Sequence, residues 1–208
     1  MMDAPLLALT RRGTALTAET AAAENMRQLI QLRWIAVAGQ TLAILFVRFG
    51  LGIPLPVVEM LGIAGLLGVA NLLATMALPR HQVHDGEVML ALLIDMAALT
   101  LQLYFSGGAT NPFISLYLLQ VVLGAILLPP LAVAVLVAAT ACGYALLTVS
   151  YVPLVLPGGL TSSHTDLFAI GHWVGFVMVA WLLVQFIVRI SRNLLARGAH
   201  LSEQRQHS

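Results

Sequence analysis

An uncharged segment, Ser106–Phe113, lies between two long apolar runs and carries the groups best suited to bind a ligand. Its adjacent glycines, Gly107 and Gly108, can adopt positive φ and leave their backbone amides unshielded. The side-chain amide of Asn111 can both donate and accept hydrogen bonds, and Phe113 offers a flat apolar surface. At the edge of a bilayer, these groups could bind a small planar molecule with carbonyl oxygens. A quinone is the obvious candidate.

Helix capping is an alternative explanation of the same segment. Gly107 or Gly108 can follow the last residue of the preceding helix, where a left-handed conformation is common. Asn111 followed by Pro112 is a usual N-cap and first-turn pair for the next helix. Capping does not account for Phe113 together with a second glycine and no charge, so both interpretations stay open.

Asp95 is the second residue that could do chemistry. It lies near the middle of an apolar run, where a charged carboxylate costs about 2.5–3.5 kcal/mol on insertion scales. Gln102 lies on the same helix face, since it follows at helical spacing. Asp95 could hydrogen-bond within the bundle, to Asn71 or Gln120, or take part in the proton transfer that accompanies quinone reduction.

A further polar stripe follows the loop on the next apolar run. Phe113, Tyr117, Gln120 and Gly124 are spaced by 4, 3 and 4 residues, so they lie on one helix face. Phe113 and Tyr117 could form the aromatic wall of a pocket that the glycine pair covers. They could equally be aromatic residues of the membrane interface, which are common at this depth.

The composition shows what kind of protein must position these residues. Of 208 residues, 60% are hydrophobic and only 9% are charged, and the mean hydropathy is +0.93. Such a composition excludes a soluble domain of this size and indicates an integral membrane protein. The single cysteine, Cys142, lies in an apolar run and is expected to be a small core residue. No metal-ligand spacing occurs, and we expect no metal site, no catalytic residue and no nucleic-acid partner.

Six apolar segments predict an all-α, polytopic membrane protein with six transmembrane helices. Each is near the roughly 20 residues that a helix needs to cross about 30 Å of hydrocarbon. Glycine or proline stands at nearly every boundary, which supports the segmentation. The segments are Ile30–Phe49, Pro54–Leu78, Gly86–Phe105, Pro112–Leu128, Leu131–Val152 and Asp166–Ile190.

The arginines predict the orientation, because cytoplasmic loops carry an excess of positive charge. Only Arg48 falls on the opposite side from the others. Both termini are therefore expected in the cytoplasm, with the Gly107–Asn111 loop at the outer face of a bacterial inner membrane. The arginines assigned to the cytoplasmic side are Arg11, Arg12, Arg27, Arg33, Arg80, Arg189, Arg192, Arg197 and Arg205.

Three regions follow from this topology. Residues 1–28 are expected to be a cytoplasmic tail, partly helical over Ala18–Leu29, and residues 29–190 the six-helix transmembrane domain. Residues 191–208 would begin a cytoplasmic signalling helix, because apolar residues continue there at an approximate spacing of three to four. The sequence contains no phosphoacceptor-histidine motif and no glycine-rich ATP loop, so we expect no kinase core in this chain.

The segment Gly107-Gly108-Ala109-Thr110-Asn111-Pro112-Phe113 resembles the GGxxNPF quinone-site heptapeptide of the RegB/PrrB/ActS family of redox-sensing histidine kinases. The order of apolar segments is also similar, with the heptapeptide between the third and fourth. In that family the membrane domain senses the ubiquinone pool and controls autophosphorylation of an attached kinase core. The resemblance implies ubiquinone as the sensed ligand, a homodimer in the lipid membrane, and a response regulator as partner of the parent protein.

We therefore expect a membrane sensor domain of a two-component system. Asn111 and the Gly107 and Gly108 amides would bind the quinone carbonyls, while Phe113 and Tyr117 would stack on the ring. The alternative is a small proton-coupled transporter that uses Asp95. A quinone-reducing enzyme subunit would need paired intramembrane histidines for haem, which are missing, and a purely structural dimerising anchor would need none of the loop residues.

Overall fold

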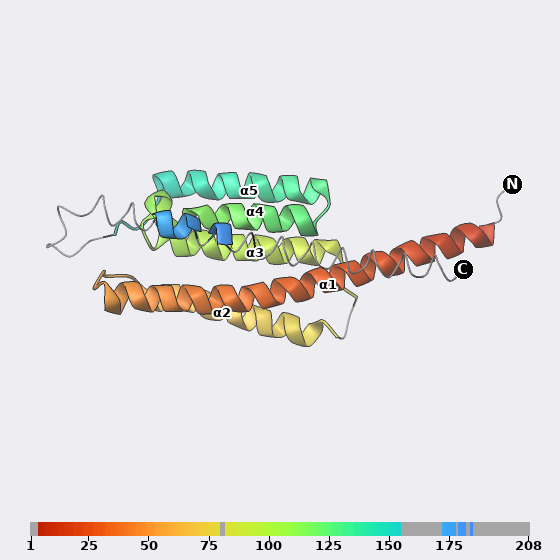
Figure 1. Cartoon of the computed structure of the whole chain (residues 1–208), viewed down its shortest axis with the longest axis horizontal. Coiled ribbons are helices and arrows are strands. Elements are labelled where there is room, and N and C mark those ends of the chain that lie inside the picture. Colours follow the sequence, from red (N-terminus) through yellow and green to blue (C-terminus); the bar gives the residue numbers. More distant parts are fainter. Residues whose placement is uncertain (1–3, 80–81, 155–171, 178, 182–183, 185–208) are drawn as a thin grey trace.

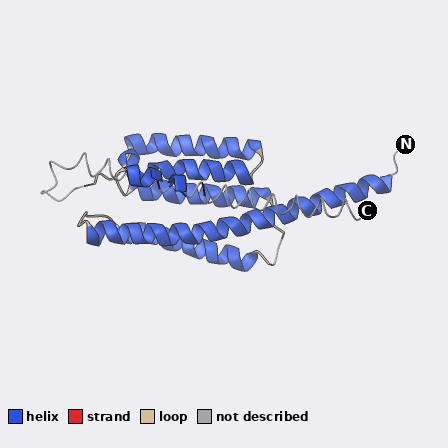
Figure 2. Ribbon diagram, viewed as in Figure 1, coloured by secondary structure: helices blue, strands red, loops and turns tan. Residues whose placement is uncertain are grey.

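The computed structural model describes residues 4–79, 82–154, 172–177, 179–181 and 184. All regular structure in these residues is helical (Figure 2), so the predicted all-α class is confirmed for them. A π-helical turn, Phe46–Gly50, ends the first helix, and the loop contains two 3₁₀ turns, Gly108–Thr110 and Pro112–Ser115. The α-helices are α1 (Ala4–Leu45), α2 (Val57–Ala77), α3 (Asp85–Tyr104), α4 (Leu116–Leu127) and α5 (Pro130–Val149).

Four of the described helices are long and apolar enough to cross a membrane, where the sequence predicted six spans. They are Ala22–Gly50, Val57–Ala77, Asp85–Tyr104 and Pro130–Val149. The apolar helix in the predicted span Pro112–Leu128 is shorter than these four, since a 3₁₀ turn opens it and α4 adds 12 residues. Most of the predicted span Asp166–Ile190 lies outside the described residues, as do residues 191–208.

Helix α1 differs most from its prediction, because it is continuous over 42 residues from Ala4 to Leu45. The segment predicted to be partly helical over Ala18–Leu29 is helical from Ala4 onward, and α1 continues from there into the first apolar segment without a break. The segment is rich in alanine, leucine, glutamate and arginine, which favour helix, and extending an existing helix avoids the cost of a new nucleus. Figure 1 shows α1 reaching well beyond the ends of the other helices.

The helices form two groups, with α3 at the centre. Figure 1 shows α1 and α2 side by side, and α3, α4 and α5 together next to them. Helix α3 contacts each of the other four long helices, and its Val88 and Leu92 are fully buried. Cys142 lies exposed on α5, so its expected place in the core is wrong. The central position of α3 decides which polar side chains meet, because Asp95 lies on this helix and the loop begins where it ends.

A loop at the helix ends and a buried ion pair in the bundle

The loop after α3 packs tightly against the end of α5. Gly107 and Gly108 have φ of 102° and 63°, the left-handed region that glycine adopts without strain. A Cβ on Gly108 would lie 2.6 Å from Cβ of Tyr151 and 2.7 Å from the Leu147 carbonyl oxygen. Both glycines are buried. The glycine pair therefore lets the loop backbone approach α5 more closely than any other residue would.

Asn111 holds the loop together as the N-cap of the following turn, the alternative that the sequence left open. Its Nδ2 donates to both the carbonyl oxygen and Oγ of Ser106, each at 2.7 Å. Its Oδ1 accepts from the Phe113 backbone N–H at 2.8 Å, and Pro112 occupies the first position of the turn. Ser106 Oγ in turn donates to the Gln102 carbonyl oxygen at 2.7 Å. Both polar atoms of the Asn111 side chain therefore hydrogen-bond within the loop.

Phe113 and Ser115 lie where the loop meets the helical segment at 172–177. Phe113 is half-buried and packs against the core. The Ser115 hydroxyl is buried and has no hydrogen-bond partner in the described part of the chain. A Cβ on Gly175 would lie 2.6 Å from the Pro112 carbonyl oxygen and 3.8 Å from Ser115 Oγ, so this segment crosses directly over the turn. Sequence reasoning missed Ser115, although a hydroxyl two residues after Phe113 was a readable signal.

Tyr117 takes a packing position that the sequence did not predict. It is 3% exposed, and its hydroxyl lies 2.6 Å from Thr100 Oγ1 on α3. A Cβ on Gly143 of α5 would lie 2.9 Å from the same hydroxyl. Tyr117 is therefore held between α3 and α5, and Gly143 leaves the space for its hydroxyl group.

Two glutamines expected to support the site bring unpaired oxygens into the bundle. Gln102 donates through Nε2 to the Met60 carbonyl oxygen at 2.8 Å, which links α3 to α2. The side-chain oxygens of Gln102 and Gln120 are buried and accept no hydrogen bond from the described residues. Both oxygens remain available to a bound donor such as water.

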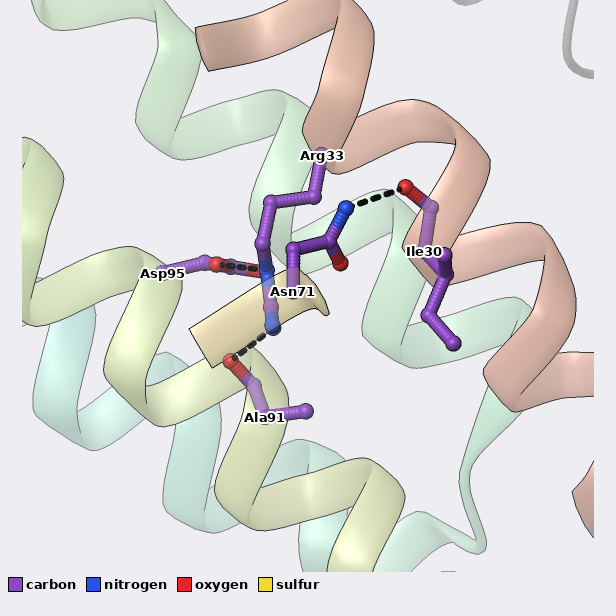
Figure 3. Close-up of polar contacts among 5 residues, drawn as sticks. All are labelled: Ile30, Arg33, Asn71, Ala91 and Asp95. Carbon is purple, nitrogen blue, oxygen red and sulfur yellow. Dashed lines mark hydrogen bonds and ion pairs between the residues drawn. The ribbon is translucent and has the colours of Figure 1, made fainter. Parts of the chain in front are cut away.

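The partner of Asp95 is Arg33, not Asn71 or Gln120 (Figure 3). Arg33 Nε lies 2.6 Å from Asp95 Oδ1, and Arg33 Nη2 donates to Asp95 Oδ2 at 3.0 Å. The same Nη2 donates to the Ala91 carbonyl oxygen at 3.1 Å. The pair thus combines one charge-assisted hydrogen bond, from Nη2 to Oδ2, with a close contact between Nε and Oδ1, and hydrogen bonds between charged groups are stronger than those between neutral ones.

The ion pair lies inside the bundle, since the side chains of Arg33 and Asp95 are only 6% and 13% exposed. Each charge offsets the cost of burying the other in an apolar environment. In the same turn of α1, the Ile30 carbonyl oxygen accepts a hydrogen bond at 2.9 Å from Nδ2 of Asn71, a fully buried residue of α2. Arg33 was predicted to lie with the cytoplasmic arginines, but it points into the bundle, and its position inside an apolar segment was a readable signal of a buried partner.

Apolar helices, a buried intramembrane ion pair and a tightly closed uncharged loop define a helical, membrane-embedded protein. Among the described residues, no group of three or more His, Cys, Asp or Glu side chains could hold a metal ion. No family model matches the chain, and no solved structure does. The class of protein therefore comes from the helices and from sequence relatives.

The chain is similar in sequence to the sensor histidine kinase RegB of Cereibacter sphaeroides. The two are 34% identical over 156 residues, which is 74% of this chain and 34% of the relative. A second RegB, from a designated strain of the same species, is 35% identical over 77 residues, 36% of this chain and 17% of the relative. The chain thus spans about a third of the length of the first of these relatives.

Proposed function

We propose that the chain is the membrane sensor domain of a histidine kinase that binds ubiquinone at the Ser106–Phe113 loop. The homology to RegB carries this proposal, because it covers 74% of the chain. In the parent protein, the quinone-bound state would control a cytoplasmic kinase core and, through it, a response regulator. We further propose six spans with both termini in the cytoplasm and a homodimer in the bacterial inner membrane.

The structure changes which loop residues would contact the quinone. Gly107, Gly108 and Asn111 are used in packing and in hydrogen bonds within the loop, so they would shape the site rather than bind the carbonyls. The half-buried Phe113 ring would stack on the quinone ring. The unpaired Ser115 hydroxyl would donate to a quinone carbonyl, since a buried hydroxyl without a partner is costly.

A sensor must distinguish the two redox forms of its ligand. The Ser115 hydroxyl would donate to a quinone carbonyl and accept from a quinol hydroxyl, and the difference in strength between these two hydrogen bonds would set its preference for one redox form. Only such a difference in affinity can shift an equilibrium between two states of the protein. Gly175, which lies against the Pro112 carbonyl, would carry a shift of the loop to the helical segment at 172–177.

The Arg33–Asp95 pair weakens the alternative of a proton-coupled transporter. A carrier carboxylate must exchange its proton with both sides of the membrane, whereas both oxygens of Asp95 contact a single guanidinium. We therefore propose a supporting, structural role for Asp95.

A titration of the purified chain in lipid nanodiscs tests the proposed function. Wild type, Phe113→Ala and Ser115→Ala would be titrated with ubiquinone, with Ser150→Ala as the control because Ser150 is exposed. Loss of one hydrogen bond, about 0.5–1.5 kcal/mol, predicts a roughly 2–12-fold weaker Kd for Ser115→Ala. Phe113→Ala is expected to bind more weakly still, and Ser150→Ala like wild type. Unchanged affinity in both loop variants would refute the site.

A further inference from the structure

One turn of α1 is bound by polar contacts to both of its neighbours. The Arg33 guanidinium contacts the Asp95 carboxylate and the Ala91 carbonyl, which lie one turn apart on the same face of α3. The Ile30 carbonyl of that same α1 turn accepts from Asn71 of α2. We call Arg33, Asp95 and Asn71 the clamp.

The clamp defines the position of α1 along α3. A slide of α1 by one residue moves Arg33 by about 1.5 Å, which is enough to break a pair of contacts at 2.6 and 3.0 Å. No water is present in hydrocarbon to replace a lost partner, and each unpaired polar group there is costly. A displacement of α1 along α3 therefore carries an energetic cost, and these contacts hold the two helices in register.

The same helix that holds the clamp also holds the loop. Asp95 lies on α3, and Gln102, seven residues further on, is joined through Ser106 to Asn111 by hydrogen bonds. A rigid helix transmits a displacement at one end to the rest of its length. On the other side of the clamp, α1 runs without a break from Arg33 back to Ala4.

We propose that the clamp couples α3 to α1, so that the N-terminal arm of α1, residues 4–21, is an output element of the membrane domain. A change at the loop moves α3, the clamp moves α1 with it, and the arm carries the movement beyond the bundle. This route through α1 is additional to the proposed route through Gly175 and the segment at 172–177. It rests on the proposed function only for the identity of the ligand that moves the loop.

Distances between spin labels test the clamp in the full chain. The labels would be placed at Arg27→Cys on α1 and Gln82→Cys just before α3, both exposed, in a Cys142→Ser background in nanodiscs. Asp95→Asn keeps the shape but removes the charge, and is expected to shift or split the distance peak by about 1.5 Å or more. Exchange of the two charges, Arg33→Asp with Asp95→Arg, is expected to restore a single peak at the original distance.

The control is Glu59→Gln, which removes an exposed carboxylate from α2 and is expected to leave the peak in place. Circular dichroism would confirm that each variant is helical. Should Asp95→Asn not fold, Asn71→Ala breaks the other half of the clamp and is expected to broaden the same peak. An unchanged distance in a folded Asp95→Asn or Asn71→Ala variant overturns the clamp.

The same label distance is then measured with ubiquinone. In wild type, saturating ubiquinone is expected to change the Arg27–Gln82 label distance, and in Asp95→Asn this change is expected to be lost although ubiquinone still binds. Binding would be followed in parallel by titration. Binding to wild type without any change in distance would refute the α1 route. Absence of binding would instead refute the proposed function, while the ligand-free distances still decide the clamp.

Discussion

Gly108 gives the sharpest prediction for the loop. In Gly108→Ala, the new Cβ would have to occupy space 2.6 Å from Tyr151 Cβ and 2.7 Å from the Leu147 carbonyl oxygen. The backbone φ of 63° adds strain for any residue with a Cβ. Left-handed strain costs about 1–2 kcal/mol and overpacking about 1–3 kcal/mol. The variant should therefore be destabilised by about 2–5 kcal/mol.

The assay is equilibrium unfolding in mixed micelles, followed by circular dichroism, together with the ubiquinone titration. Gly62→Ala is the matched control, because a Cβ on Gly62 meets no atom within 4 Å and its φ is negative. Replacing glycine in a helix by alanine should leave stability unchanged or raise it by up to about 1 kcal/mol. If Gly108→Ala unfolds at the same point as Gly62→Ala, the close approach of the loop to α5 does not exist and the reasoning is wrong.

Further predictions concern the contacts between helices. Replacing one partner of the buried ion pair, as in Arg33→Met, should lower the free energy of unfolding by about 3–5 kcal/mol, whereas Arg33→Met with Asp95→Leu should lower it much less, because no unpaired charge remains. A double-mutant cycle followed by unfolding measures both changes. Additive losses of stability would contradict the ion pair. Tyr117→Phe should lose about 0.5–1.5 kcal/mol with the hydrogen bond to Thr100, and a wild-type unfolding midpoint would show that the bond contributes nothing. Gly175→Ala should separate the 172–177 segment from the loop, since the new Cβ would lie 2.6 Å from the Pro112 carbonyl oxygen. The loop should then be cleaved faster by protease, and an unchanged cleavage rate would rule the contact out.

The sequence predicted the helical class and most helix positions, because apolar runs bounded by glycine and proline report directly on helices in a membrane. It failed on the length of two helices. Helix α4 is shorter than its apolar run, because the first residues after Asn111 form a 3₁₀ turn. Helix α1 is longer than its apolar run, because polar helix formers extend it.

The partners of the polar residues could not be predicted from the sequence either. Asp95 was found from the sequence, since a carboxylate in an apolar run is conspicuous, but its partner was not. Arg33 lies 62 residues away in sequence, and only the packing of α1 beside α3 brings the two charges together. Asn111 had two local interpretations with equal sequence support; its hydrogen bond from the Phe113 backbone N–H confirms the cap, and quinone binding at this loop stays a prediction.

The central claim, that ubiquinone binds at the loop, is tested most directly by covalent capture. A photoreactive ubiquinone analogue would be activated with the full chain in nanodiscs, and the labelled peptides mapped by mass spectrometry, with and without excess ubiquinone. We predict labelling between Tyr104 and Leu118 that ubiquinone suppresses and that Phe113→Ala reduces. Labelling spread over exposed faces of α2 and α5, unaffected by competing ubiquinone, would contradict the account.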